Sequence, residues 1–314
     1  MNYEGRICRT PMERASFMLP VMVGCSYNAC RLCMLFKHLK LRTIPVAEVE
    51  AELKRVKDGK GSLKRIFLGD GNAFYLGYDY LMMIIDLIHR YFPECSEINM
   101  DATVESVEKV TDEELLKLRE AGVNTLYIGI ESGLDDVLSF MNKCNDTTRA
   151  RKAIERLHKA GINYGAHIMT GIAGRGRGIE NAEATAALLN ETKPVSVTNF
   201  SMFTQTRSPL WQDVLHGRYF PASAQEAMEE EYRLIELLET ETKYDGFQDF
   251  IEVRTRGNIP EDKEKMLKKL SENIEKYRNE EPIYACVYVE EGGCACEVKE
   301  ADADPETAFG SLEK

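Results

Sequence analysis

The sequence predicts an α/β fold, in the form of a partial TIM-like (β/α)6 barrel followed by a mainly helical C-terminal extension. Short apolar runs alternate with amphipathic helical patterns from Phe17 to about Met202, which gives six strand–helix repeats. Strands joined by such crossovers lie parallel, and the crossovers are right-handed. The chain's unusual glycine- and cysteine-rich sequences directly follow the apolar runs, at the strand ends where a barrel of this kind carries its site.

Six apolar runs predict the strands in order. FMLPVMVG leads directly into the first clustered cysteine, RIFLGDGNA ends in a glycine turn, and EINMDAT is the third strand. NTLYIGIESG, INYGAHIMTG and VSVTNFSM complete the set. The predicted strands span residues 17–24, 65–73, 97–103, 124–133, 162–171 and 195–202.

Helical patterns separate these strands. VAEVEAELKRV is helical, YLMMIIDLIHRYF is strongly apolar, and DEELLKLREAG ends at a glycine stop. The predicted helices span residues 46–56, 80–92 and 112–122, with two more near 147–160 and 180–191.

The pattern changes after Thr206, where two charged amphipathic helices flank an irregular stretch. These helices are predicted over residues 225–242 and 261–278. We therefore expect three regions: a lead-in at 1–16, the barrel at 17–205, and an extension at 206–314 that acts as a lid, a brace or a substrate-binding region.

The composition is that of an ordinary soluble globular enzyme, since 44% of the 314 residues are hydrophobic and 29% are charged. No apolar run reaches the roughly 18 residues of a membrane span. The charged N-terminus lacks the apolar core of a signal peptide. We expect a cytoplasmic protein without a membrane partner. The net charge of −12 gives no support to a nucleic-acid partner, because nucleic-acid binders usually carry a basic stripe.

Three of the nine cysteines lie close together, at Cys25, Cys30 and Cys33, in the spacing C-x4-C-x2-C. The total number of cysteines is odd and three of them are clustered, which argues against structural disulfides and for reduced thiolates. Clustered thiolates select zinc or an iron–sulfur cluster. Zinc remains an alternative because His38 could supply a fourth ligand, and a chance grouping of thiols is another. Three cysteines without an obvious fourth fit an iron–sulfur cluster that keeps one iron open.

The loop GCSYNACRLCMLFK resembles the cluster loop of radical S-adenosylmethionine (SAM) enzymes. It is similar to a subgroup written G-C-S-x-N-x-C-x-x-C, with an Elongator-like or coproporphyrinogen-dehydrogenase-like core. The commoner spacing in the superfamily is C-x3-C-x2-C, so the first gap here has one extra residue. The resemblance covers about Phe17 to Leu210. It implies that the three cysteines hold a 4Fe–4S cluster and that SAM binds the fourth iron.

The same resemblance assigns SAM contacts at the ends of the second and third strands. The turn Gly69, Asp70, Gly71 and Asn72 corresponds to the segment that meets the SAM amino group. Glycine suits this place because a backbone without Cβ approaches a ligand closely. An ordinary strand-end turn is the alternative. Asp101 occupies the place of the acid that ends the third strand.

Further contacts are implied after the fourth and fifth strands. Glu131, followed by Ser132, corresponds to the residue that meets the ribose hydroxyls, and a carboxylate can accept both hydrogen bonds. Lys143 lines up with the base that pairs with the SAM carboxylate. His167 stands where many relatives have an acid. A solvated surface lysine and a core histidine are the alternatives for Lys143 and His167.

The resemblance implies an oxygen-sensitive enzyme in which reductive cleavage of SAM yields a 5′-deoxyadenosyl radical that takes hydrogen from a substrate. We expect a small-molecule or peptide substrate and a one-electron donor such as flavodoxin or ferredoxin. The GRGRG loop can cradle an anionic group, which makes Arg175 and Arg177 substrate candidates. A zinc-stabilised binding protein and a tRNA-modifying radical SAM enzyme are the alternatives.

A second cluster is not expected, although three cysteines near the C-terminus have the spacing C-x7-C-x-C. These are Cys286, Cys294 and Cys296. Auxiliary clusters generally need four protein ligands, so three thiolates leave the set incomplete.

Overall fold

The computed structural model describes residue 4 and residues 9–287 and divides into two compact units. The first unit comprises Met1–Asn28, Leu39–Gly129 and Thr148–Ala166, and the second comprises Ala29–His38, Ile130–Thr147 and His167–Lys314. This division follows spatial proximity, and the predicted division at residues 17–205 and 206–314 stays a prediction.

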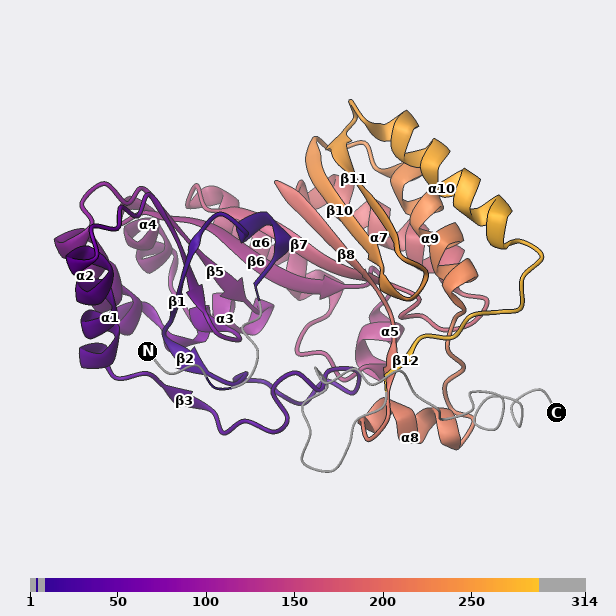
Figure 1. Ribbon diagram of the computed structural model, residues 1–314, viewed down its shortest axis with the longest axis horizontal. Coiled ribbons are helices and arrows are strands. Elements are labelled where there is room, and N and C mark those ends of the chain that lie inside the picture. The colour runs from indigo at the N-terminus through magenta and orange to yellow at the C-terminus, as the bar shows by residue number, and fades with distance from the viewer. Residues whose placement is uncertain (1–3, 5–8, 288–314) are drawn as a thin grey trace. The chain divides into compact units, whose positions relative to one another are not determined.

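The strands form a mostly parallel α/β sheet, which confirms the predicted fold class (Figure 1). Eight strands follow the order β1-β4-β5-β6-β7-β8-β10-β11 without closing. The six predicted strands are β1 (Phe17–Pro20), β4 (Arg65–Gly69), β5 (Glu97–Ala102), β6 (Val123–Glu131), β7 (Asn163–Thr170) and β8 (Ser196–Ser201). They follow one another in the sheet in chain order, as repeated crossovers require.

In the first unit, β1, β4, β5 and β6 pair in parallel register, with Leu19 opposite Leu68 and Leu68 opposite Met100. Helices α1 (Val46–Asp58) and α2 (Tyr78–Tyr91) pack against each other (Figure 1). The first predicted strand is shorter than expected. It ends at Pro20, and β2 (Met22–Val23) pairs instead with β3 (Arg42–Thr43) in an antiparallel ladder.

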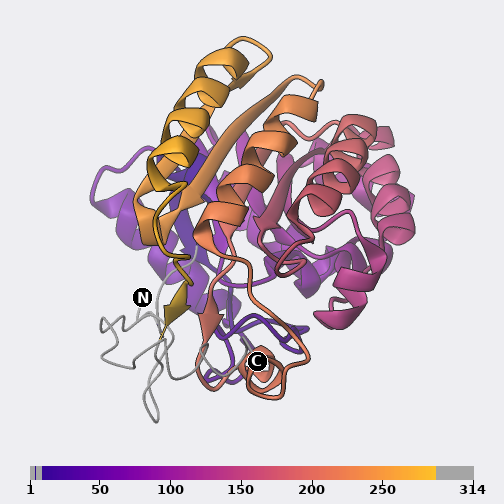
Figure 2. The same cartoon turned by 90° about the vertical axis from the view of Figure 1, so that its right-hand side faces the viewer.

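In the second unit, β8 pairs in parallel with β10 (Thr242–Gln248), which forms a hairpin with β11 (Val253–Ile259). Helix α9 (Ala224–Leu237) packs between α7 (Gly178–Thr192) and α10 (Lys263–Tyr277), and Figure 2 shows α9 and α10 side by side in orange and yellow. The hairpin occupies the stretch that the sequence predicted to be irregular.

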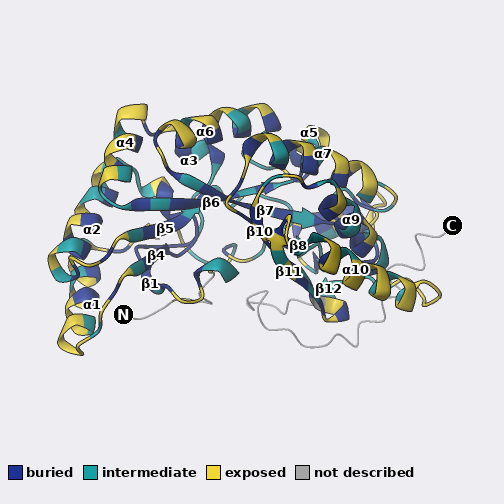
Figure 3. Cartoon of the chain, turned by 90° about the horizontal axis from the view of Figure 1, so that it is seen from above, coloured by how far each residue is buried: buried dark blue, intermediate teal, exposed yellow. Residues whose placement is uncertain are grey.

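The remaining elements are short or connect the larger ones. They are η1 (Pro11–Glu13), η2 (Ala73–Leu76), α3 (Val104–Glu108), α4 (Asp112–Glu120), α5 (Asp135–Phe140), α6 (Thr147–Lys159), β9 (Thr204–Gln205), α8 (Pro209–Leu215), η3 (Asp249–Ile251) and β12 (Cys286–Val287). Exposed residues concentrate on helices such as α4 and α10, while the strands are largely buried (Figure 3). Within the described residues, no helix combines the length and apolarity that crossing a membrane requires.

Candidate functional site

The cysteine loop spans both units, with Cys25 in the first and Cys30 and Cys33 in the second. All six cysteines that the structure describes are thiols rather than disulfides. In the second unit, the Arg31 N–H donates to the Met141 carbonyl at 3.0 Å, which anchors the loop to the residue after α5. No three Cys, His, Asp or Glu side chains of the described residues are already gathered as a metal site. Metal ligation by the three cysteines therefore stays a prediction.

In the first unit, the glycine turn after β4 lies against the start of the cysteine loop. Gly71 has a φ of +56°, and a Cβ added there would lie 2.1 Å from the Gly24 carbonyl oxygen. Only glycine permits this approach. The Asn72 side chain donates to the hydroxyls of Ser26 and Thr103, each at 3.0 Å. Gly71 and Asn72 are thus brought together with the residues on either side of Cys25.

Asp101 lies near the end of β5 with its Oδ1 atom buried. That oxygen has no hydrogen-bond partner among the described residues. Burial raises the pKa of the carboxyl group well above its usual value, and the charges of Asp70 and Glu13 raise it further. A buried polar atom without a partner requires an explanation, and a ligand that supplies the missing hydrogen bond is one.

Glu13 is a buried acid of the first unit that the sequence analysis missed. Its Oε1 atom accepts hydrogen bonds from the Tyr127 hydroxyl at 2.6 Å and from the Asn99 amide at 2.8 Å, and its Oε2 atom accepts one from Ser16. Burial raises the pKa of Tyr127, and the Glu13 charge raises it further. These partners hold Glu13 as a satisfied buried group, consistent with a structural role.

In the second unit, Glu131 and Lys143 form an ion pair with 2.9 Å between Lys143 Nζ and Glu131 Oε1. Glu131 ends β6 with a φ of +65°, and the two side chains are 14% and 11% exposed. Burial alone would lower the pKa of Lys143, but the charge of the Glu131 carboxylate, that of a Cys30 thiolate and the hydrogen bond to Glu131 outweigh it, so this pKa is raised. Lys143 is therefore a paired, buried cation and not a solvated surface residue.

His167 lies on β7, and the charges of the same ion pair affect its pKa. Burial lowers the pKa of the imidazole to about 4, with Glu131 opposing this shift and Lys143 adding to it. Its ring meets Phe200 edge-on, with 6.0 Å between the ring centroids. At neutral pH the second unit thus combines a carboxylate, an ammonium group and a neutral imidazole.

Ser132 belongs to a buried hydrogen-bond chain that the sequence analysis did not foresee. Its hydroxyl donates to Asn181 and accepts the Leu134 N–H at 3.0 Å. The Asn181 amide donates to Glu230 Oε1 at 2.6 Å, and Glu230 Oε2 accepts the Gly171 N–H at 2.8 Å. This series of hydrogen bonds therefore joins the turn after β6 to the turn after β7.

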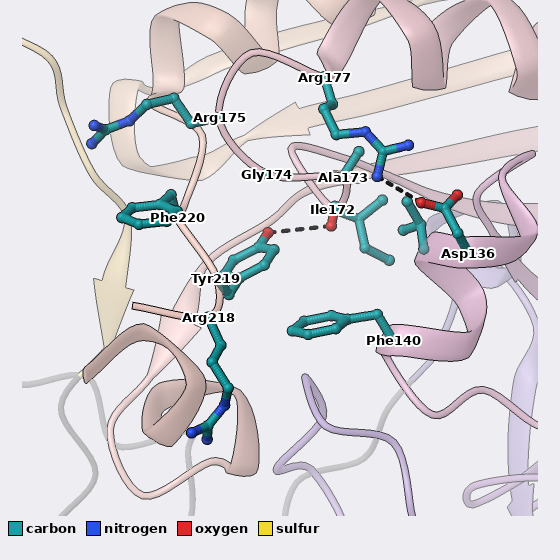
Figure 4. Close-up of a pocket in the computed structure, with 11 residues that line it drawn as sticks. Asp136, Phe140, Ile172, Ala173, Gly174, Arg175, Arg177, Arg218, Tyr219 and Phe220 are labelled. Atoms are coloured by element: carbon teal, nitrogen blue, oxygen red, sulfur yellow. Dashed lines mark hydrogen bonds and ion pairs between the residues drawn. The ribbon is translucent and has the colours of Figure 1, made fainter. Parts of the chain in front are cut away.

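The two predicted substrate arginines have different surroundings (Figure 4). Arg177 donates to Asp136 at 2.8 Å and to both oxygens of Glu180, and these carboxylates raise its pKa. Arg175 donates to the Tyr284 hydroxyl at 2.7 Å and has no carboxylate partner among the described residues. Both arginines line one cavity.

Comparisons with known proteins give a family and several relatives. The family model described as the Radical SAM superfamily matches residues 19–189. The heme chaperone HemW of Bacillus subtilis (strain 168) is 26% identical over 209 residues, which cover 64% of this chain and 54% of that protein. A tRNA-2-methylthio-N(6)-dimethylallyladenosine synthase of Chlorobium phaeobacteroides is 26% identical over 246 residues, which cover 76% and 52%. The chain thus spans about half the length of these curated relatives.

Solved structures share the fold. The FeFe-hydrogenase maturase HydG of Carboxydothermus hydrogenoformans aligns over 94% of this chain and 65% of its own, with a TM-score of 0.54 and 16% identity. A methylornithine synthase, PylB, aligns over 95% and 80%, with a TM-score of 0.52 and 13% identity. At such identities the likeness concerns the fold alone.

Proposed function

The chain belongs to the radical SAM superfamily of enzymes, whose cofactors are a 4Fe–4S cluster and SAM, and from this premise we propose that it abstracts hydrogen from a small-molecule or peptide substrate. The main support for the proposal is the extent of the family match. Residues 19–189 include the three clustered cysteines and every predicted SAM contact. A zinc-stabilised binding protein would account for the thiols but not for this match.

The described residues fit both cofactors. The clustered cysteines are not tied up in disulfides and can therefore ligate iron as thiolates, and Asp101 offers a buried oxygen that has no hydrogen-bond partner among the described residues. Gly71 brings bare backbone against the residue before Cys25. When bound, the cluster and SAM supply one-electron cleavage that yields a 5′-deoxyadenosyl radical.

In this proposal, side chains of the second unit bind and orient SAM. Glu131 keeps acceptor capacity for the ribose hydroxyls while one of its oxygens holds Lys143, because a carboxylate has about four lone-pair sites. Lys143, whose pKa is raised, stays charged and pairs with the SAM carboxylate. His167 stays neutral at pH 7 and adds a hydrogen-bonding group without adding charge.

The partners are proposed from composition and chemistry. A net charge of −12 supports a small molecule or peptide over tRNA, although one relative carries the name of a tRNA-modifying enzyme. Flavodoxin or ferredoxin serves as the electron donor, and the cytoplasm is the proposed compartment.

Anaerobic reconstitution tests the proposal. The full chain is loaded with iron and sulfide, reduced in the presence of SAM, and assayed for 5′-deoxyadenosine. We expect a brown protein with broad visible absorption and SAM-dependent product. A colourless protein that retains zinc and forms no 5′-deoxyadenosine would contradict the proposal.

A further inference from the structure

Two turns of the second unit follow strands that carry predicted SAM contacts. Strand β6 ends at Glu131, and the turn after it begins with Ser132 and Gly133. Strand β7 carries His167, and the turn after it begins at Gly171. Glu131 has a φ of +65°, a backbone conformation that a residue other than glycine keeps only where its surroundings impose it. The contacts of the turn after β6 therefore determine where the Glu131 carboxylate lies.

The turn after β6 is fixed on helix α7. A Cβ added to Gly133 would lie 2.3 Å from the backbone carbonyl carbon of Ala184, so only glycine fits between the turn and the helix. The Gly133 N–H donates to the Thr185 hydroxyl at 2.9 Å. The Ser132 hydroxyl donates to Asn181, which lies on the same helix. Two consecutive residues of the turn therefore contact α7 directly.

Glu230 connects this helix to the turn after β7. It is 1% exposed and lies on α9, which packs against α7 (Figure 1). Its Oε1 atom accepts a hydrogen bond from the Asn181 amide at 2.6 Å, and its Oε2 atom accepts one from the Gly171 N–H at 2.8 Å. A Cβ added to Gly178 would lie 3.0 Å from Oε2, so α7 packs closely around the carboxyl group. One side chain therefore connects, through Asn181 and Ser132, the turns that follow β6 and β7.

The next residue, Glu231, is an equally buried acid of the same helix and provides a comparison. Its oxygens accept hydrogen bonds from the Tyr244 hydroxyl and the Gln248 amide at 3.0 Å each. Both donors lie on β10, so Glu231 connects α9 to that strand rather than to the turn after β6. The two adjacent acids of α9 thus share their burial but differ in the segments that they hold.

We propose that Glu230 is a positioning residue for SAM. Its two hydrogen bonds hold the turn after β6 in a fixed place relative to the turn after β7, and this places the Glu131 carboxylate to accept hydrogen bonds from the ribose hydroxyls. The inference rests on the proposed function. A side chain that holds a ligand-binding group changes the affinity for the ligand without touching it, because a displaced group loses its hydrogen bonds. Glu230 acts in this way, through Asn181 and Ser132.

A carboxyl group suits this role because it presents one acceptor oxygen to each of two donors. Glutamine keeps both contacts when the Asn181 amide is reversed. Its oxygen then accepts the Gly171 N–H, and its NH2 group donates to the Asn181 oxygen. The reversed Asn181 amide donates in turn to the Ser132 hydroxyl oxygen, which can accept that hydrogen bond. Alanine keeps none of these contacts, so Glu230→Gln should retain the SAM affinity that Glu230→Ala loses.

Calorimetric titration of the reconstituted full chain with SAM tests the inference. Glu230→Ala should bind SAM about tenfold more weakly than the parent, and Glu230→Gln should bind it within about twofold of the parent. Glu231→Ala is the matched control. It should lose stability to urea as Glu230→Ala does, because each variant leaves two buried donors without an acceptor, but it should bind SAM like the parent. In the 5′-deoxyadenosine assay, Glu230→Ala should raise the KM for SAM and change kcat little.

A second variant and a second measurement sharpen the test. Asn181→Ala breaks the same series of hydrogen bonds from α7 and should weaken SAM binding by a similar factor, which also serves if Glu230→Ala does not fold. Combining it with Glu230→Ala should add little, because the two residues act as one unit. In the SAM-free protein, hydrogen exchange at the Gly133 and Gly171 amides should quicken more in Glu230→Ala than in Glu231→Ala.

SAM cleavage is measured in the same preparations. A folded Glu230→Ala that binds SAM like the parent, or a Glu231→Ala that weakens binding as much, would overturn the inference. If the parent cleaves SAM while either result is found, the inference fails alone. If the affinities change as expected and no 5′-deoxyadenosine forms, the proposed function fails alone. A parent that does not bind SAM would overturn both.

Discussion

The buried ion pair of Glu131 and Lys143 determines how substitutions in the second unit act. Each charge is mostly shielded from water, and each compensates the other across 2.9 Å. Removing one partner of such a pair leaves a buried charge without compensation, whereas removing both leaves none. Stability and SAM affinity should therefore respond differently to single and double substitutions.

Glu131→Gln should lower the free energy of unfolding by about 3–5 kcal/mol, because Lys143 would remain buried without its carboxylate. Glu131→Gln/Lys143→Met should recover part of that loss. The single variant should also bind SAM about ten- to a hundredfold more weakly, since a hydrogen bond to a charged acceptor contributes about 1.5–3 kcal/mol. Urea unfolding and calorimetric titration measure the two effects. A single variant as stable as the parent would show that the pair carries little energy.

Replacing any one of Cys25, Cys30 or Cys33 with Ala should abolish SAM cleavage and most iron binding, because the cluster needs all three ligands. Cys144→Ala is a matched control, since Cys144 lies in the same unit as Cys30 and Cys33 but outside the loop motif. Iron analysis and the 5′-deoxyadenosine assay provide the measurements. Parent-level product from Cys30→Ala would remove Cys30 from the ligand set.

Sequence reasoning found the residues that have a local signal and missed those defined by distant contacts. Glu131 follows an apolar run, so its burial and its need for a partner were predictable, and Lys143 lies only 12 residues away. Glu13 and Tyr127 are 114 positions apart, and Asn181 and Glu230 are 49 apart. No motif marks those pairs, because the fold alone brings them together.

At the scale of elements, helix α9 contains two consecutive buried acids, Glu230 and Glu231. Glu230 accepts hydrogen bonds from Gly171 and Asn181, and Glu231 accepts them from Tyr244 and Gln248 at 3.0 Å each. Burial raises the pKa of Glu230 to about 8 and that of Glu231 to about 7, although their hydrogen bonds act in the opposite direction. The folded state therefore keeps protons that the unfolded chain releases.

This difference predicts that stability falls as pH rises. The usual pKa of a glutamate is 4.5, so between that value and about 8 the unfolded chain binds fewer protons than the folded one at these two positions. Their stabilising contribution is complete below pH 4.5 and is lost as pH rises through 7 and 8. Between pH 4.5 and 8, the unfolding free energy of Glu230→Gln should fall by a few kcal/mol less than that of the parent. Substitution of the exposed neighbour, Glu229→Gln, should leave the pH profile unchanged. Parallel pH profiles for the parent and Glu230→Gln would contradict the prediction.

Element prediction succeeded where apolar runs were continuous and failed where charge interrupted them. The six core strands are apolar in sequence, and all six are present. β10 and β11 alternate buried residues with charged ones such as Lys243, Arg254 and Arg256, which hid their strand character. Neighbouring strands, rather than local sequence, recruit them into the sheet.

At the scale of the whole chain, family membership accounts for one 4Fe–4S cluster but not for the three cysteines near the C-terminus, Cys286, Cys294 and Cys296 (the tail cysteines). Cys286 lies in β12 opposite Thr204, where burial raises the pKa of its thiol despite a hydrogen bond with Thr204. A raised thiol pKa disfavours the thiolate that a metal requires. Cys294 and Cys296 lie outside the described residues.

We therefore expect about four irons per chain after reconstitution, the content of a single 4Fe–4S cluster. The value should not change when Cys286, Cys294 and Cys296 are all replaced by Ser, because three tail thiols leave a second cluster one ligand short. Iron and sulfide analysis of both proteins measures this, with Cys30→Ala as the control that loses the loop cluster. A reproducible value near eight that falls to four in the triple variant would establish a second cluster, and Cys286 would then have to become a ligand despite its buried thiol.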